Sequence, residues 1–272
     1  MEFHGHISPI DCVLLDLDDT LYPSTTGIAG ACKHNIEEFL AKKCGVSAER
    51  ARSLRVEHFR NYGSSLAGLI ALGYDVHPDE YHSYVHGNLP YEQIAPDPQL
   101  VKLLRSIPQP KILFTNSDQA HVQKVLKRLS IDEDCFQGIV CFETLNRHLF
   151  QEVKGDATAA SAKVTLKPSA AAIEAAVGFT GFDPRRTLFV DDNERNIAAG
   201  KAVGLITALI GKRAKTNEAD YLLNNIHDLG RVVPQMGLRG VLKEEEKEKE
   251  EGVDKMRSEL GSIRPPPTPI QA

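Results

Sequence analysis

The sequence has neither an excess of basic residues nor a long apolar run. Its 32 Lys and Arg against 37 Asp and Glu give a net charge of −5 at pH 7, so a basic surface for nucleic acid is not expected. Its apolar runs fall far short of the roughly 20 residues that cross a bilayer, so we expect no transmembrane helix and no membrane partner. Residues 1–9 lack the basic region and apolar stretch of a signal peptide.

Cysteine is also sparse. The five cysteines are odd in number and widely spaced, and none forms a C-x-x-C pair. This pattern predicts reduced thiols in a cytoplasmic or nuclear protein. A content of 42% apolar and 25% charged residues is typical of globular domains, and 272 residues suffice for one ordinary domain with a smaller insert.

Short apolar runs predict the strands of a sheet that is buried on both faces. These runs are residues 12–16, 111–115, 138–142, 187–191 and 205–210. Helical patterns lie between most of them, at residues 120–129, 169–177 and 193–203. Strands that alternate with helices predict an α/β fold with a doubly wound parallel sheet, whose functional site lies at the carboxyl ends of the strands.

The alternation is interrupted at residues 24–98. Four amphipathic helices are expected there, at residues 29–44, 47–60, 65–72 and 78–86. They predict a small helical cap inserted after the first strand, with residues 10–23 and 99–235 forming the catalytic core. Residues 147–166 are weakly patterned and predict a flexible connection. Residues 240–272 are charged and proline-rich and predict a disordered tail, whose partner the sequence does not identify.

Paired carboxylates follow two of the predicted strands. A tight turn after Asp16 can direct the carboxylates of Asp16 and Asp18 into one cleft, where one attacks and the other transfers protons. The alternative is an acidic turn that only satisfies backbone donors. Asp191 and Asp192 end another strand, and such neighbouring charges favour a cation, so Mg²⁺ could be held by Asp192 and Asp16 together. The alternative for Asp192 or Asn193 is to cap the following helix.

Two further motifs are less specific when taken alone. Thr115, Asn116 and Ser117 can donate hydrogen bonds to an anionic group, although Asn and Ser are also common turn residues. Lys167 precedes Pro168, which favours an extended Lys167 and can open a helix, so this lysine could project into the same cleft. A solvated lysine is the alternative.

The order of these four motifs resembles the haloacid dehalogenase superfamily of phosphohydrolases over residues 10–230. The resemblance implies that Asp16 is the nucleophile that forms an aspartyl-phosphate, and that Asp18 is the general acid and then the base that activates water. It implies Mg²⁺ bound by Asp16, Asp192 and the backbone carbonyl of Asp18. It also implies phosphate binding by Thr115, Asn116 and Ser117, a stabilising cation in Lys167, and supporting roles for Asp191 and Asn196.

Four segments resemble one branch of that superfamily more closely. Residues 16–23, 61–68, 81–86 and 142–146 are similar to the plant and fungal pyrimidine 5′-nucleotidases, which are relatives of the suppressor of disruption of TFIIS. This resemblance implies hydrolysis of UMP or CMP to nucleoside and phosphate. A phosphatase for another small phosphate ester, such as a sugar phosphate, phosphoglycolate or lysophosphatidate, is the alternative. A non-catalytic regulator that binds a partner through its tail is a second alternative.

Aromatic and histidine side chains of the predicted cap leave their roles open. Tyr62, Tyr81 and Tyr84 could stack on a nucleobase, although tyrosines at helical spacing are more often packing residues. His82 and His86 stand four residues apart on one helix face, a spacing that suits zinc, but the sequence shows no third ligand.

Overall fold

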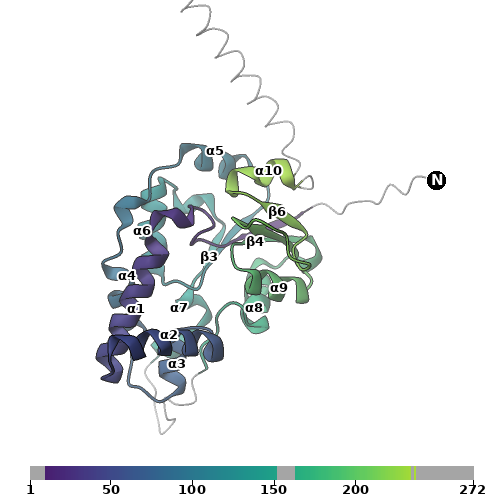
Figure 1. The fold of residues 1–272 in the computed structure, drawn as a ribbon. Helices are drawn as coiled ribbons and strands as arrows, with labels where there is room; N and C mark the ends of the chain where they lie inside the picture. Colours follow the sequence, from purple (N-terminus) through teal and green to yellow (C-terminus); the bar gives the residue numbers. More distant parts are fainter. Residues whose placement is uncertain (1–9, 152–162, 234–235, 237–272) are drawn as a thin grey trace, which may run out of the picture.

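The computed structural model describes residues 10–151, 163–233 and 236. Six parallel strands form one sheet in the order β3-β2-β1-β4-β5-β6 (Figure 1). They are β1 (Cys12–Leu15), β2 (Lys111–Phe114), β3 (Gly138–Val140), β4 (Thr187–Asp191), β5 (Ile206–Ile210) and β6 (Tyr221–Leu223). The strand order reverses at β1, so the loops after β1, β2 and β4 meet at the point where parallel sheets form their sites. The predicted doubly wound sheet is confirmed.

Helices cover both faces of this sheet. They are α5 (Pro98–Ser106), α6 (Gln119–Leu129), α7 (Phe142–Leu145), α8 (Ala170–Thr180), α9 (Glu194–Ala202) and α10 (Leu229–Val232). Because side chains alternate along a strand, Cys12 and Leu14 share a core with α8 and α9, whereas Val13 and Leu15 share one with α5, α6 and α10. Figure 1 shows α8 and α9 below the strands and α5 and α10 above them.

Several elements were not expected from the sequence, among them β6 and α5. Strand β6 is a three-residue edge strand with one buried residue, too short to show a pattern. Helix α5 carries start signals that could have identified it, since Pro98 is its first residue and the Asp97 side chain accepts a hydrogen bond from the Leu100 N–H.

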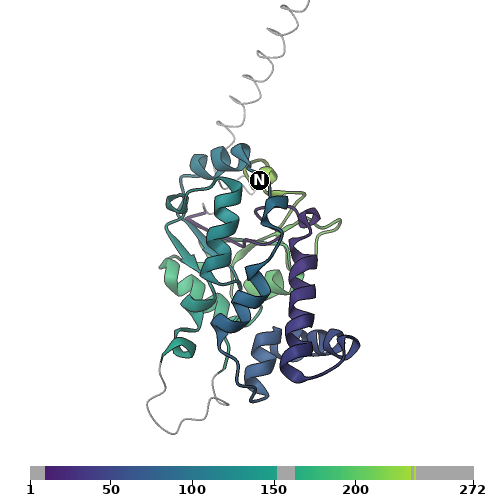
Figure 2. The same cartoon turned by 90° about the vertical axis from the view of Figure 1, so that its left-hand side faces the viewer.

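The predicted helices of residues 24–98 are present and pack around a hydrophobic core that also includes Phe142 and Leu166 from outside this segment. They are α1 (Ile28–Cys44), α2 (Ala48–Tyr62), α3 (Ser65–Ala71) and α4 (Pro78–Gly87). Figure 2 shows α1 as a long helix with α2 and α3 grouped at its end. Tyr81 and Tyr84 pack edge-on against Phe39, with ring centroids 5.2 and 5.4 Å apart, so both contribute to packing within this insert. Its role as a cap stays a prediction.

The remaining predictions on chain organisation fall largely outside the described residues. Within residues 147–166, a short 3₁₀ helix spans Arg147–Phe150, and residues 152–162 are not described. The predicted tail at residues 240–272 is not described either. Among the described helices, none has both the length and the apolar character that crossing a membrane requires.

Two glycines in helices provide a test of the packing between sheet and helix. A Cβ on Gly200 of α9 would lie 2.7 Å from Cδ1 of the buried Phe189, whereas a Cβ on the exposed Gly30 of α1 would meet nothing within 4 Å. We expect Gly200→Ala to lower the free energy of unfolding by about 1–2 kcal/mol, because overpacking outweighs the gain in helix propensity. Gly30→Ala should raise it by about 0.5–1 kcal/mol. Denaturant titration of both variants checks the pair, and equal effects would contradict the packing described.

Candidate active site

Asp16 lies at the centre of the carboxyl edge of the sheet, directly after β1. Its N–H donates to the Val190 carbonyl at 3.0 Å, which continues the pairing of β1 with β4. Its Oδ1 accepts a hydrogen bond from Lys167 Nζ at 2.7 Å, and its Oδ2 accepts one from the Thr20 hydroxyl at 3.0 Å. Burial raises the pKa of Asp16 well above its ordinary value, against the opposing effect of Lys167. The carboxylate is therefore held in one orientation in a poorly solvated site.

Lys167 is brought to Asp16 from 151 residues away in the chain. Its Nζ donates to Asp16 Oδ1 at 2.7 Å, to the Phe114 carbonyl at 2.7 Å and to Asp191 Oδ2 at 2.8 Å. Burial lowers the pKa of Lys167, but the two carboxylates outweigh this effect and hold the pKa above its ordinary value. The side chain is a buried, charged ammonium with all three donors used. The alternative of a solvated lysine is wrong.

Two asparagine side chains hold the segment that carries Lys167. Asn116 Nδ2 donates to the Lys167 carbonyl and Asn116 Oδ1 accepts from the Lys167 N–H, both at 2.9 Å. Asn146 does the same for Thr165, with distances of 3.0 and 2.7 Å. The amide of Asn116 thus positions the lysine backbone, and phosphate binding by Asn116 stays a prediction.

The fully buried Asn146 is expected to matter for stability. Replacing Asn146 by Ala leaves the N–H and the carbonyl of Thr165 without these partners, so we expect the free energy of unfolding to fall by about 2–3 kcal/mol. Asn88→Ala, at an exposed position after α4, should change it by less than about 0.5 kcal/mol. Denaturant titration measures both variants. If the free energy of unfolding falls no more for Asn146→Ala than for Asn88→Ala, the two hydrogen bonds to Thr165 are unimportant for stability.

Asp18 is fixed by three donors from three parts of the chain. Its Oδ1 is 2.6 Å from the Tyr22 hydroxyl and 2.7 Å from His121 Nε2, and its Oδ2 accepts from the Ser117 hydroxyl at 2.8 Å. Burial raises the pKa of Asp18, but His121, Tyr22 and Ser117 together hold it below its ordinary value. The Tyr91 hydroxyl lies 2.8 Å from the other nitrogen of His121. The carboxylate of Asp18 is therefore held in one orientation and in its charged form, ready to accept a proton.

Sequence reasoning missed several of these partners. Thr20 and Tyr22 each follow, by four residues, the carboxylate that they contact, a spacing that the turn after β1 produces. No sequence pattern pointed to His121 as a partner of Asp18, because its position depends on how α6 packs against the sheet.

The carboxylates of Asp191, the last residue of β4, and of Asp192, which follows it, have different environments. Asp191 is fully buried, and besides Lys167 it accepts hydrogen bonds from the Asn193 N–H at 2.8 Å and from Asn196 Nδ2 at 2.9 and 3.0 Å. Asp192 is more open, and its Oδ2 lies 3.4 Å from Lys212 Nζ. Helix α9 is capped by the Asn193 side chain, so the capping alternative holds for Asn193 and is wrong for Asp192.

A group of three carboxylates here fits a hard divalent cation. Asp16, Asp191 and Asp192 each offer an oxygen, and these oxygens lie within 4.8 Å of one another. Burial and the charge of Asp191 raise the pKa of Asp192. Asp19 adds a further carboxylate, whose Oδ1 is buried and has no hydrogen-bond partner among the described residues. Burial and the charges of Asp192 and Asp18 raise the pKa of Asp19 to about 6. This concentration of oxygen ligands suits Mg²⁺, which binds through carboxylates and water.

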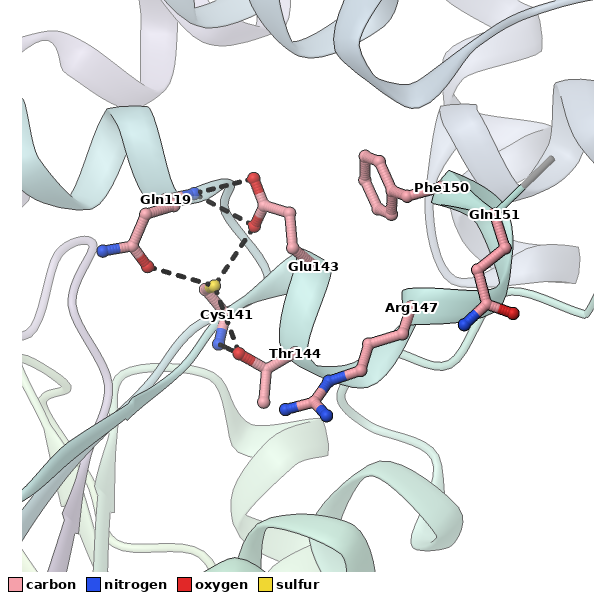
Figure 3. Close-up of a pocket in the computed structure, with 7 residues that line it drawn as sticks. All are labelled: Gln119, Cys141, Glu143, Thr144, Arg147, Phe150 and Gln151. Atoms are coloured by element: carbon pink, nitrogen blue, oxygen red, sulfur yellow. Dashed lines mark hydrogen bonds between the residues drawn. The ribbon is translucent and has the colours of Figure 1, made fainter.

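A pocket with a volume of about 370 Å³ lies at the carboxyl ends of β2 and β3 (Figure 3). Its lining residues are Gln119, Cys141, Glu143, Thr144, Arg147, Phe150 and Gln151. The carboxylate of Glu143 accepts from the Gln119 N–H at 3.1 Å through both oxygens, so it is held at the start of α6. Figure 3 shows Gln119 and Glu143 on one side of this space and Phe150 and Gln151 on the other.

Comparison with known proteins identifies the family of the chain. A family model for haloacid dehalogenase-like hydrolases matches residues 10–204, more than half of the chain. Phosphate metabolism protein 8 of Saccharomyces cerevisiae is 26% identical over 199 residues, which cover 70% of this chain and 58% of that protein. Phosphoglycolate phosphatase of Haemophilus influenzae is 34% identical over 92 residues, which cover 34% of this chain and 33% of that protein. The chain thus covers less than two thirds of either relative.

The fold is shared with solved structures. The crystal structure of a HAD phosphatase from Thermococcus onnurineus aligns with a TM-score of 0.52 at 16% sequence identity, covering 82% of this chain and 97% of that one. At this identity the likeness concerns the fold, and the chemistry is argued from the site itself.

Proposed function

Because the chain belongs to the haloacid dehalogenase-like hydrolase family, we propose that it is a Mg²⁺-dependent pyrimidine 5′-nucleotidase that hydrolyses UMP or CMP. It is a phosphatase-like hydrolase of that family. The contact of Lys167 with Asp16 and Asp191, beside the firmly held Asp18, is the observation that supports phosphoryl transfer. The nucleotide substrate is supported by the resemblance of residues 16–23 and 61–68 to pyrimidine nucleotidases.

The first chemical step is attack by the Asp16 carboxylate on the phosphorus atom. A bond forms between a carboxylate oxygen and phosphorus, the ester bond breaks, and Asp18 passes to the departing 5′-oxygen of the nucleoside the proton that it takes up from the monoanionic phosphate ester on binding. In the second step, Asp18 takes a proton from a water molecule whose oxygen attacks the same phosphorus. Inorganic phosphate leaves and the Asp16 carboxylate is restored.

Charge neutralisation allows the phosphate to approach Asp16. Lys167 lies 2.7 Å from the nucleophilic carboxylate and offsets part of its charge. Mg²⁺ would be held by Asp16, Asp192 and the backbone carbonyl of Asp18, and when bound it would neutralise charge on the transferring group. Asp191 takes a supporting role, because its oxygens already bond Lys167 and Asn196.

Phosphate binding is assigned to the loop after β2. The Thr115 hydroxyl oxygen accepts the Ser117 N–H at 3.0 Å, which directs the hydroxyl proton of Thr115 elsewhere, toward a phosphate oxygen in our proposal. The Ser117 hydroxyl donates to Asp18 at 2.8 Å, so this residue also orients the acid.

The role of Asp18 gives a prediction that depends on the leaving group. Asp18→Asn should lower steady-state phosphate release from UMP by about 10²- to 10⁴-fold, because both steps lose their proton carrier. With p-nitrophenyl phosphate, whose leaving group needs no proton, the variant should still release one equivalent of nitrophenolate in a rapid burst. Rapid-quench kinetics measure the burst. An Asp18→Asn enzyme without a burst, or with unchanged turnover of UMP, would contradict the assignment.

A substrate panel tests the proposed function. Phosphate release would be measured with Mg²⁺ on UMP, CMP, AMP, GMP, a sugar phosphate, phosphoglycolate and lysophosphatidate. Selective hydrolysis of UMP and CMP is expected, and preferred turnover of another ester would retain the mechanism and replace the substrate. Phosphoglycolate is the alternative that a relative favours. No turnover of any ester would favour the regulator, and deleting residues 240–272 would then be expected to abolish partner binding.

A further inference from the structure

The structure places a buried group of metal-ligating side chains beside Asp18, apart from the proposed Mg²⁺ site. His82 and His86 project from the same face of α4, and Asp118 comes from the loop between β2 and α6. Their ligand atoms lie within 4.8 Å of one another, and each residue is at least nine-tenths buried. The sequence alone showed the two histidines, whereas Asp118 stands 32 residues beyond His86 and becomes visible as a third ligand only in the fold.

We propose that His82, His86 and Asp118 form a binding site for a transition-metal ion, with Zn²⁺ as the best fit. Two imidazoles and one carboxylate are ligands typical of Zn²⁺, whereas Mg²⁺ prefers an all-oxygen site. Three protein ligands leave a fourth position for water. This proposal does not depend on the phosphatase reaction.

One of two distances between the ligand atoms matches a tetrahedral site, and the other is shorter. With bonds of about 2.0 Å, neighbouring ligand atoms should lie about 3.3 Å apart. His82 Nδ1 lies 3.4 Å from Asp118 Oδ1. His86 Nδ1 lies 2.5 Å from the same oxygen, and this distance must lengthen by about 0.8 Å when an ion takes the place of the hydrogen bond.

The hydrogen bonding of His82 supplies an independent argument. His82 is 7% exposed, yet neither of its ring nitrogens has a hydrogen-bond partner among the described residues. Buried polar groups in folded proteins are almost always paired, so an unpaired imidazole facing a carboxylate and a second imidazole points to a missing ligand.

The neighbouring side chains separate this site from the catalytic one, although the two sites lie close together. The ring of Phe142 packs on His82 with centroids 4.6 Å apart and shields one side. The ring of His121 packs on His86 at 4.6 Å, but both nitrogens of His121 are already engaged, by Asp18 and Tyr91. An ion here would join α4 of the helical insert to the core loop that precedes α6, so its main effect should be to hold the two together.

Metal titration of the full chain tests the proposal. After removal of bound metal with a chelator, Zn²⁺ binding would be measured by competition with a chromophoric chelator, and Co²⁺ would report the ligand geometry through its visible absorption. Because Zn²⁺ could also occupy the carboxylate site, the titration is run in an Asp192→Asn background. In that background, one equivalent of Zn²⁺ should bind, and His82→Asn should weaken it by at least about 100-fold. His34→Asn, an exposed histidine on α1, is the matched control and should leave binding unchanged.

A melting experiment covers the case in which a variant folds poorly. Zn²⁺ should raise the melting temperature of the Asp192→Asn protein and should not raise that of the same protein carrying His86→Asn. The proposal is overturned if the Asp192→Asn protein binds no Zn²⁺, or if it binds Zn²⁺ with the same affinity and the same rise in melting temperature when His82 or His86 is replaced. Either result would leave these residues as an ordinary buried cluster.

Discussion

Replacing Asp16 by Asn should lower phosphate release by at least about 10⁴-fold, because the amide cannot serve as the nucleophile that accepts the phosphoryl group. The same change should not destabilise the protein. The folded-state pKa of Asp16 is raised by burial, so the charged form is unfavourable in the fold at neutral pH, and a neutral side chain of the same shape removes that cost.

Paired assays of activity and thermal unfolding check this expectation. Asp132→Asn, an exposed carboxylate on the core that pairs with Arg105, serves as the control and should keep both activity and stability. Loss of activity together with an unchanged or higher melting temperature would show that Asp16 takes part in the reaction and is not needed for stability. Activity within tenfold of the wild type would be incompatible with its role as nucleophile.

Replacing Lys167 by Met should damage both activity and stability. The change leaves the buried carboxylates of Asp16 and Asp191 without their shared cation, so the free energy of unfolding should fall by about 3–5 kcal/mol at neutral pH. The loss should shrink as the pH falls, because protonation of either carboxylate removes its unpaired charge. Phosphate release should also fall steeply, since the phosphate would then approach an unshielded anion.

A surface ion pair of similar length provides the control for Lys167. Lys201 lies 2.6 Å from Asp220, but its side chain is 43% exposed, so Lys201→Met should cost less than about 1 kcal/mol. Denaturant titrations over a range of pH compare the two variants. Equal losses of unfolding free energy for both variants would show that burial of the charged groups does not determine the effect. A loss for Lys167→Met that does not depend on pH would show the same.

The parts of the site that lie next to buried strands could be predicted from the sequence. Asp16 and Asp191 each come at the end of an apolar run, so the strand pattern alone puts them at one edge of the sheet. Lys167 has no such context, and only the order of motifs pointed to it, because its position depends on a contact across 151 residues.

Other features required the packing of whole elements. His121 and Asp118 lie on or beside α6, and their neighbours depend on how that helix meets α4 and the loop after β1, which local sequence does not encode. Asn116 shows the opposite case: the motif predicted a ligand contact, and the fold uses its amide to hold the Lys167 backbone. Residue types at strand ends predicted where the candidate site lies, whereas the partners of each side chain were set by tertiary structure.

The most direct test of the account is to trap the phosphorylated enzyme. The Asp18→Asn protein would be mixed with p-nitrophenyl phosphate and Mg²⁺, quenched in acid and digested, and the peptide that contains Asp16 would be examined by mass spectrometry. We predict that this peptide gains one phosphoryl group, located on Asp16, and that the Asp16→Asn protein shows none. Phosphate found on another residue, or turnover of the ester by the wild-type protein with no phosphorylated peptide in any variant, would contradict the proposed aspartyl-phosphate mechanism.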